Sequence, residues 1–322
     1  MVKLIPYKRI KVYVKIKESI DWGVKIIGAP DVWKLSEGAD VSIAVLDTGS
    51  APTHKDLIES FIYERKNIVG YNATGKGKEN NIIDKQSHGT HCSGIIAANR
   101  NGIGIIGVSP KTKIIPVKVL NDEGEGDLNW IIKGIYWVLE NYKKYKIKII
   151  SMSLGAPYGV EELRKALVEA KKEKLVCVCA VGNEGNWTDL GYPARYAEEK
   201  LCIAVGAIES KKRITEFSNT GKGMQKMGVV APGYEILSTI PDNKYAIFSG
   251  TSMATPHISG ILALAISKHL KYGGETPLTN LDEAYEHLKW LSEDIGKIGA
   301  DNVYGIGLPV LTEEKFKILS KK

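Results

Sequence analysis

Strand-like and helix-like segments alternate through the middle of the chain, and this alternation constrains the fold more than any other feature. Short apolar runs rich in β-branched residues predict buried strands, and stretches with apolar residues at helical spacing separate them. The predicted strands are 41–46, 114–120, 147–153, 175–180 and 201–206, and the predicted helices include 127–142 and 161–172. Such alternation predicts an α/β fold of three layers (α/β/α), with helices on both faces of a central, mostly parallel sheet.

The composition of the chain narrows its possible partners. Of its 322 residues, 43% are hydrophobic and 25% are charged, as in an ordinary globular protein. The formal net charge is +7, but the lysines are scattered and no aromatic residues are interleaved with them, so we expect no nucleic-acid partner. No apolar stretch reaches membrane-spanning length without a charge or a glycine, so we expect no membrane partner either.

The cysteines and the N-terminus both bear on the compartment. The four cysteines lack the spacing of a zinc finger or a C-x-x-C motif, and buried free thiols fit a reducing compartment. They are Cys92, Cys177, Cys179 and Cys202. The first nine residues contain neither an uninterrupted apolar region nor a small-residue cleavage site, unlike a secretory signal. We therefore expect a cytoplasmic protein.

Two polar residues stand where predicted strands and helices meet. Asp47 follows the strand 41–46, and the carboxyl ends of parallel strands are where α/β folds place ligands and catalytic groups. The alternative is an aspartate that only forms a turn. His88 begins a run of small and apolar residues that predicts a helix. The alternatives for it are a structural histidine or, together with His91, a metal ligand, although no third ligand lies nearby in the sequence.

A glycine-led turn, Gly-Thr-Ser-Met-Ala at 250–254, runs into the apolar stretch 258–266, which predicts a buried helix. Ser252 would lie in its first turn, where backbone N–H groups and the helix dipole stabilise negative charge. A serine needs a base, and the base needs an orienting group, before it can act as a nucleophile. The alternative is an ordinary helix cap. In the loop 180–185, Asn183 can donate its amide to a developing oxyanion, unless the loop is only a turn.

The order of these motifs resembles that of a known family. Asp-Thr-Gly at 47–49, His-Gly-Thr-His at 88–91 and Gly-Thr-Ser-Met-Ala at 250–254 follow one another as acid, base and nucleophile, the order found in subtilisin. With Gly-Asn-Glu-Gly at 182–185, the chain resembles the subtilisin-like serine proteases from about residue 22 to about residue 310. The resemblance implies the subtilisin-like fold, a serine endopeptidase, polypeptide substrates and no catalytic metal or organic cofactor.

The resemblance also implies the roles of the catalytic residues. Ser252 matches the nucleophile, His88 the base, and Asp47 the group that orients the base and stabilises its charged form. Asn183 matches the side-chain donor of the oxyanion hole.

A substrate cleft is implied in the same way. Two segments match those that pair with an extended substrate as added β-strands, and because main-chain pairing is largely indifferent to side chains, we expect broad specificity. Their residues are Gly124, Gly126, Ser153, Leu154 and Gly155. Small residues match the walls of the pocket for the side chain before the scissile bond, and an acid at the rim could favour a basic side chain. These are Ala180, Gly182, Gly191 and, at the rim, Glu184. Cys92 follows the base-bearing turn, as in family members that are sensitive to thiol reagents, and we expect the same here.

Calcium is implied by the resemblance and not by an EF-hand pattern. Asp56 matches a carboxylate ligand of the family, and the loop 99–105 matches the ligand loop. The matching loop positions are Asn99, Asn101 with its side-chain oxygen, and Ile103 and Ile105 with their backbone carbonyls. The alternative is a loop that closes without metal. A second ion site, after Pro193, stays open because 197–200 looks longer than the usual segment.

The start of the chain resembles the intracellular branch of the family. Leu4, Ile5, Pro6 and Tyr7 match a motif that, in that branch, lies across the active site and is later removed. An extended peptide can add to the cleft as a strand, with Tyr7 in a pocket and Pro6 holding the nearby bond out of reach. The sequence thus predicts an inhibitory extension at 1–25, a catalytic domain at 26–311 and a tail at 312–322. It also predicts an edge strand at 12–17, and the branch implies a homodimer.

Four alternatives to this interpretation stay open. The extension could be a disordered basic tail, since termini often are. The chain could be a secreted-type subtilisin that lacks its leader, or a non-catalytic peptide-binding homologue on the same fold. A zinc hydrolase is the fourth, although the chain has no H-E-x-x-H or comparable cluster.

Overall fold

The central sheet consists of parallel strands. The computed structural model describes residues 2–4, 7–185, 188–273 and 278–318. Within these residues a seven-stranded sheet has the order β12-β11-β10-β9-β3-β7-β6, and every neighbouring pair is parallel. Its strands are β3 (Ser42–Asp47), β6 (Tyr71–Asn72), β7 (Lys113–Lys118), β9 (Ile147–Met152), β10 (Val176–Ala180), β11 (Ile203–Ile208) and β12 (Gly228–Pro232).

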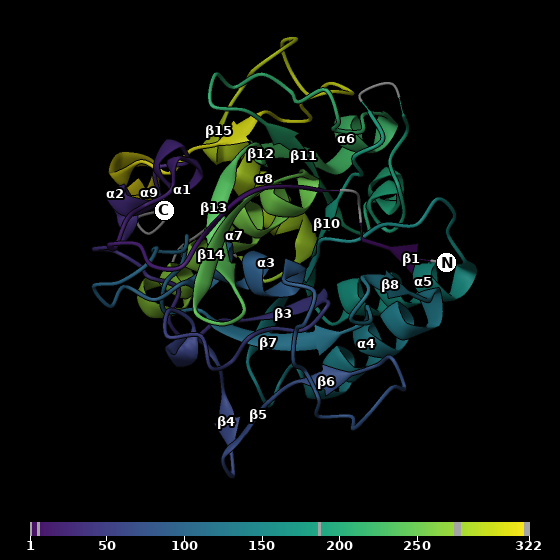
Figure 1. Cartoon of the computed structure of the whole chain (residues 1–322). Helices are drawn as coiled ribbons and strands as arrows, with labels where there is room; N and C mark the ends of the chain where they lie inside the picture. Colours follow the sequence, from purple (N-terminus) through teal and green to yellow (C-terminus); the bar gives the residue numbers. More distant parts are fainter. Residues whose placement is uncertain (1, 5–6, 186–187, 274–277, 319–322) are drawn as a thin grey trace.

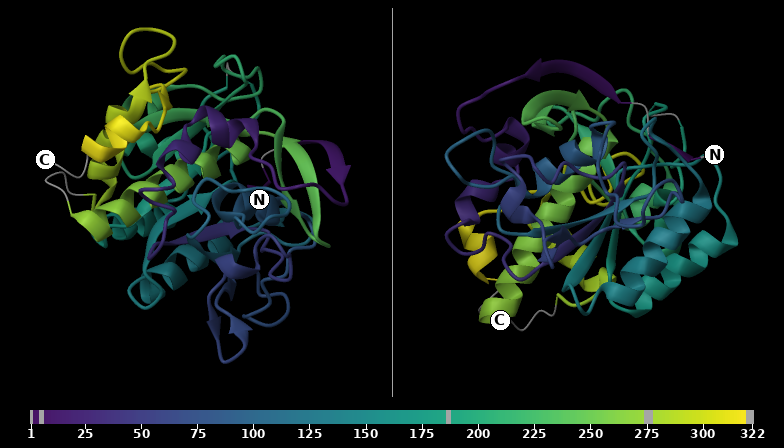
Figure 2. Two further views of the ribbon diagram at one scale, coloured as in Figure 1. Left: turned by 90° about the vertical axis from the view of Figure 1, so that its left-hand side faces the viewer. Right: turned by 60° about the horizontal axis from the view of Figure 1, so that its bottom comes forward.

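Helices cover both faces of this sheet, as Figures 1 and 2 show. On one face α3 (His88–Ala97) and α7 (Thr251–Tyr272) pack together, and on the other α4 (Leu128–Asn141) packs against α5 (Glu161–Lys172). Because both faces are covered, the strands are buried on both sides, which is why they appear in the sequence as continuous apolar runs. The predicted α/β/α fold is confirmed, and the strands and helices predicted in the middle of the chain agree within two residues at each end, whereas the helix predicted from 258–266 extends over all of α7.

A second, antiparallel sheet lies beside the first. It has the order β13-β14-β2 and comprises β13 (Ile236–Ile240), β14 (Lys244–Ser249) and β2 (Lys8–Tyr13). β2 is the predicted edge strand, but it begins four residues earlier than expected and ends at Tyr13. The reason is its partner, because β14 pairs with residues 8–13 of the extension.

Short elements complete the described chain. They are β1 (Val2–Lys3), α1 (Trp22–Ile26), α2 (Ala29–Val32), η1 (Ile58–Ser60), β4 (Tyr63–Glu64), β5 (Asn67–Ile68), β8 (Glu125–Gly126), η2 (Ala194–Glu199), α6 (Lys222–Met227), α8 (Leu281–Leu291), β15 (Ser292–Glu293), β16 (Leu308–Pro309) and α9 (Glu313–Ile318). Among the described residues, none of the helices has both the length and the apolarity that crossing a bilayer requires.

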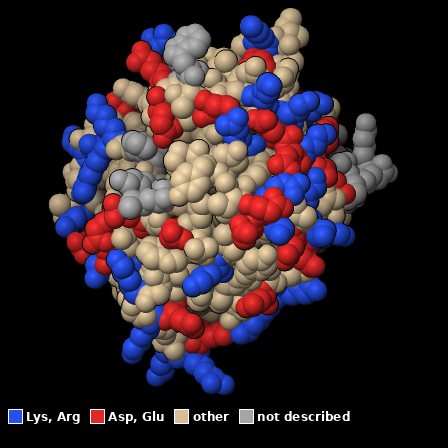
Figure 3. All heavy atoms as spheres, turned by 90° about the vertical axis from the view of Figure 1, so that its right-hand side faces the viewer, with Lys and Arg blue, Asp and Glu red and all other residues tan. Residues whose placement is uncertain are grey.

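The C-terminal segment packs on the body of the protein. Phe316 of α9 is fully buried, and the ammonium group of Lys268 lies 4.6 Å from the centre of its ring. The described part of the predicted tail is therefore anchored by an apolar side chain and a cation–π contact. The outer surface carries acids and bases side by side, as Figure 3 shows for one face, in line with the scattered lysines of the sequence.

Candidate active site

The acid and the base predicted from the sequence meet at the carboxyl edge of the central sheet. Asp47 is the last residue of β3 and His88 is the first residue of α3, and both are fully buried. The His88 Nδ1 atom lies 2.8 Å from Asp47 Oδ1 and 3.0 Å from Asp47 Oδ2. Gly89 permits this approach, since a Cβ there would lie 2.2 Å from the Gly49 carbonyl oxygen and 3.1 Å from Asp47 Cβ.

This pairing controls the charge of the histidine. Burial lowers the pKa of His88, but the adjacent Asp47 carboxylate, together with the Cys92 sulfur, outweighs burial and raises that pKa well above its usual value. Since Nδ1 faces Asp47, the other ring nitrogen, Nε2, faces away from it; Nε2 is buried and has no hydrogen-bond partner among the described residues. A histidine held in this way can accept a proton at Nε2.

Ser252 lies in the first turn of α7 and is fully buried. Its hydroxyl donates to the backbone oxygen of Ser153 at 3.1 Å, and within the described chain it has no hydrogen bond to His88. The serine must therefore exchange this acceptor for His88 Nε2 before it can act as a nucleophile.

A proline shapes the backbone around the serine. Pro256 lies inside α7 and has no N–H to donate to the carbonyl of Ser252, four residues earlier. That carbonyl instead accepts hydrogen bonds from Ser153 Oγ at 2.9 Å and from the Cys92 thiol at 3.5 Å. The start of α7 is thus tied to the loop after β9 and to α3.

The side chain of Asn183 is oriented by the start of α7. Its oxygen accepts the Thr251 N–H at 2.8 Å. On the same side, a Cβ at Gly250 would lie 2.8 Å from Asn183 Nδ2, so the absence of a side chain at Gly250 makes room for the amide. The geometry directs an N–H donor to the neighbourhood of Ser252, where a developing oxyanion would be stabilised.

One buried acid organises the loop before His88, and we did not single it out from the sequence. Asp84 accepts five hydrogen bonds at 2.6–2.9 Å, from the hydroxyls of Thr48 and Thr90 and from the backbone N–H groups of Gln86, Ser87 and Thr90. Thr48 follows Asp47 directly, so Asp84 links the strand that carries the acid to the loop that carries the base. The signal for it was weak, because loop aspartates commonly bond nearby N–H groups.

The N-terminal segment pairs with a predicted substrate segment. β1 is antiparallel to β8, with Val2 opposite Gly126, and the Leu4 N–H donates to the Gly124 oxygen at 2.8 Å. A Cβ at Gly124 would lie 2.6 Å from the Leu4 side chain. Figure 1 shows the N-terminal chain, in purple, passing from the side of β14 toward β8. Ile5 and Pro6, two of the predicted inhibitory residues, lie outside the described residues.

Tyr7 places the extension beside the histidine. Its ring lies 5.0 Å from that of His88 and 4.8 Å from that of Phe248. Its hydroxyl forms a hydrogen bond with Gln86, whose side-chain oxygen also accepts the backbone N–H of His88 at 3.1 Å. The extension therefore contacts the base as well as the rim of the cleft.

The other predicted cleft residues lie at the ends of β9 and β10. Ser153 and Leu154 are buried after β9, and Gly191 donates its N–H to the oxygen of Val181, next to Ala180 at the end of β10. The carboxylate of Glu184 accepts a hydrogen bond from Asn219 Nδ2 at 2.6 Å. The two remaining residues are Gly155, which is half-buried, and Gly182, whose N–H donates to the Thr251 hydroxyl at 3.4 Å.

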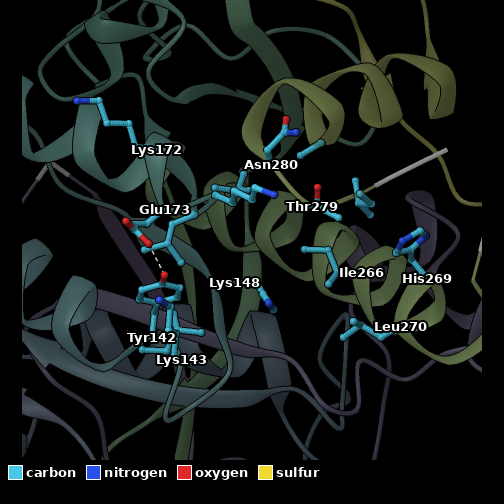
Figure 4. A pocket seen from close by; sticks show the side chains of 16 residues that line it. Tyr142, Lys143, Lys148, Lys172, Glu173, Ile266, His269, Leu270, Thr279 and Asn280 are labelled. Carbon is cyan, nitrogen blue, oxygen red and sulfur yellow. Dashed lines mark hydrogen bonds between the residues drawn. The ribbon is translucent and has the colours of Figure 1, made fainter.

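A hollow of about 420 Å³ lies at the opposite edge of the sheet. Figure 4 shows it among Tyr142, Lys148, Ile266 and Asn280, with the Tyr142 hydroxyl bonded to Glu173. Its lining includes Ile147, where β9 begins, whereas Asp47 stands where β3 ends. None of the predicted site residues lines it, so it is not part of this site.

A buried acid with an unsatisfied oxygen lies against the loop predicted to bind calcium. Asp56 accepts the Ile105 N–H at its Oδ2 atom, at 2.8 Å, while its Oδ1 atom is buried and has no hydrogen-bond partner among the described residues. Burial raises the pKa of Asp56 to about 7, although the Ile105 N–H and the side chains of Tyr245 and Asn101 act in the opposite direction. An unpaired carboxylate oxygen of this kind fits a hard cation such as Ca²⁺.

Two of the predicted calcium ligands in this loop already accept hydrogen bonds from backbone N–H groups. The side-chain oxygen of Asn99 accepts the Glu59 N–H at 3.1 Å, and that of Asn101 accepts the Ile103 N–H at 3.1 Å. Glu18, which the sequence analysis did not single out, accepts the N–H groups of Asn101 and Gly102. It adds a second carboxylate near Asp56.

The four cysteines are free and buried, as predicted. The Cys92 thiol lies 3.9 Å from His88 Nδ1, and burial raises its pKa. Among the described residues, Asp47, His88 and Cys92 form the only group of three potential metal-ligating side chains with ligand atoms within 4.8 Å of one another. The thiol therefore touches the base, and its sensitivity to thiol reagents stays a prediction.

Comparisons with known proteins agree with this geometry. The chain matches the sequence profile of the subtilase family over residues 38–307. It is 45% identical to an intracellular serine protease of Paenibacillus polymyxa over 269 residues, which cover 82% of this chain and 77% of that protein. It is 44% identical to the major intracellular serine protease of Bacillus subtilis over 271 residues, covering 82% of this chain and 80% of that protein. Subtilisin amylosacchariticus is 39% identical over 256 residues, covering 78% and 62% of the two chains.

Proposed function

Because the chain belongs to the subtilase family and is a serine endopeptidase that acts on polypeptides, we propose that Ser252, His88 and Asp47 perform its chemistry. The observation that carries this assignment is the buried His88–Asp47 pair, with His88 Nε2 left without a partner among the described residues at the start of the helix that follows Asp84. Asn183 is the proposed side-chain donor to the oxyanion.

The proposed reaction proceeds through an acyl-enzyme. Ser252 Oγ attacks the scissile carbonyl while His88 Nε2 takes the hydroxyl proton, and Asp47 stabilises the resulting imidazolium. The carbonyl oxygen becomes negative and is stabilised by the amide of Asn183 and the N–H groups at the start of α7. His88 then donates its proton to the leaving amine, and the same groups activate the water that releases the acid.

The enzyme is proposed to be made in a self-inhibited form, with its N-terminal extension as the inhibitor. The pairing of β1 with β8 and the position of Tyr7 beside His88 support this, since a substrate would need both places. Removal of the extension would then activate the enzyme. Recognition through backbone pairing also supports broad specificity.

Calcium is proposed as a structural ion at the loop 99–105. Asp56 would hold it through Oδ1, with the loop carbonyls as neutral ligands, and Glu18 would contribute a further carboxylate only while the extension is still attached. The ion would neutralise the buried Asp56 carboxylate and stiffen the loop.

Two further proposals concern the setting of the enzyme. A cytoplasmic location is supported by the names of the intracellular relatives and by the buried free thiols. A homodimer is proposed from the same branch of the family, and sedimentation of the full chain tests it.

A serine-directed fluorophosphonate probe tests the catalytic assignment. After incubation with calcium, intact mass and peptide mapping should show one probe on Ser252, with none in Ser252→Ala and much slower labelling in His88→Ala. A chain that binds peptides but never reacts with the probe would be a non-catalytic homologue.

A further inference from the structure

One edge of β14 is covered by the extension. β14 pairs with β13 on one side and with β2 on the other. The β2 pairing is antiparallel and runs from Lys8 opposite Ser249 to Tyr13 opposite Tyr245. Without β2, this edge would present unpaired N–H and C=O groups, and such an edge recruits extended polypeptides as added strands.

The extension runs through the cleft in a single direction. Leu4 is bonded to Gly124 on one side, Tyr7 lies beside His88 and Gly250, and β2 follows directly. Tyr7 thus marks where the extension passes the base, and β2 begins at the next residue. In a bound substrate, the place of β2 would be taken by residues that begin a few positions after the scissile bond.

The side chains of β2 are mostly exposed, although Ile10 and Val12 keep only 39% and 41% of their surface exposed and Tyr13 packs against the cluster around Tyr245. Five of its six residues are exposed, and no ion pair is found for its three basic residues among the described residues. The pairing tolerates one irregularity, where Ile10 is left without an opposite residue between Ile247 and Phe248. The part of this binding that does not depend on sequence is the backbone ladder, which most sequences can form.

We propose that, once the extension is removed, the edge of β14 binds the part of a substrate that follows the scissile bond. That part would add as an antiparallel strand of up to six residues, in the place of β2. The ligand class is an extended, unstructured polypeptide, because a compact loop cannot supply so many extended residues in a row. The inference rests on the proposed protease function, and it makes the enzyme prefer long unfolded chains to short peptides.

Two quenched fluorescent peptides test this surface. Both carry the same residues before the scissile bond, and they carry either two or nine residues after it. The full chain is incubated with calcium until its activity is constant, and kcat/KM is measured for each peptide. The longer peptide should be cleaved about ten-fold more efficiently, as expected from two or three net backbone hydrogen bonds.

Backbone methylation distinguishes strand pairing from a general length effect. Two further long peptides carry backbone N-methyl groups on alternate residues, starting beyond the fourth residue after the scissile bond. One peptide is methylated at the odd positions and the other at the even positions. In an added strand, every second N–H group points to β14 and the others point away from it. The peptide that is methylated at the N–H groups facing β14 should lose the ten-fold gain in kcat/KM, and the other peptide should largely keep it. Equal kcat/KM for the short and long peptides, or equal effects of the two methylation patterns, would overturn the inference. Failure to cleave even the short peptide would instead contradict the proposed function, and the inference with it.

Discussion

The ring of Tyr7 lies 5.0 Å from the ring of His88 and is tilted by 56° to it. The Tyr7 hydroxyl is hydrogen-bonded to Gln86, whose side-chain oxygen also accepts the backbone N–H of His88. Residues 81 positions apart are thus in contact, and the contact joins the extension to the base. A tyrosine near the N-terminus thus packs directly against the histidine.

Truncation of Tyr7 should weaken the hold of the extension. Tyr7→Ala removes ring contacts to His88 and Phe248 and the bond to Gln86, so we expect active enzyme to appear several-fold faster. The measurement is the lag before peptide cleavage after calcium is added. Tyr63→Ala, at an exposed tyrosine on β4, is the matched control, and equal lags in the two variants would contradict the role of Tyr7.

Asp47→Asn should lower activity and move its pH dependence. The Asp47 carboxylate holds the pKa of His88 above its usual value, and only neutral His88 can act as a base. The wild-type kcat/KM should therefore rise with pH around a raised pKa, and the variant should rise at lower pH. Its kcat should fall by about four orders of magnitude, because an amide favours the wrong tautomer. If kcat/KM rose over the same pH range in the variant as in the wild type, the proposed role of Asp47 would be contradicted.

Asp84→Asn should affect turnover more than substrate binding. An asparagine can replace one acceptor oxygen, but its NH₂ group opposes the Thr90 N–H. The loop before His88 should then loosen, and kcat should fall by roughly 10- to 100-fold with little change in KM. Asp301→Asn is the matched control, since Asp301 also accepts backbone N–H groups but in a distant loop. Comparable losses in both variants would show a general effect on folding.

Calcium should stabilise the protein through Asp56. At a calcium concentration about 100-fold above Kd, binding adds about 2.7 kcal/mol to the free energy of unfolding. Chelation should therefore lower the Tm of the wild type, while Asp56→Asn should melt at the same temperature with and without the chelator. Asp40→Asn, at an exposed acid paired with Lys146, should keep the calcium dependence. A wild-type Tm that does not change when the chelator is added would contradict the proposed calcium site.

The parallel sheet was predictable because its strands are buried on both faces. A strand such as β3 is apolar at almost every position, and the helices between strands keep their own periodicity. The polar residue at its end, Asp47, stands out for the same reason.

The antiparallel sheet was missed because its evidence is local and weak. Three residues, 241–243, join β13 to β14, and two of them, Asp242 and Asn243, have positive φ, as tight hairpin loops require. That pair was the available signal for β13 and β14. The pairing of β14 with β2 has no such signal, because an edge strand with exposed side chains carries little pattern.

The contacts of single polar residues could not be read from the sequence either. Asp84 and Glu18 resemble any loop or surface acid until the backbone N–H groups around them are placed. Their partners lie up to 84 positions away in the chain, and only the folded backbone brings them together.

The most direct test of the central claim is a time course of the full chain with excess calcium, beside Ser252→Ala. Intact mass and cleavage of a chromogenic peptide are followed together. The account predicts loss of an N-terminal fragment that parallels the rise in activity, with neither event in the variant. Full activity at time zero with the extension intact would contradict self-inhibition, and no cleavage by either chain at any time would contradict the catalytic assignment.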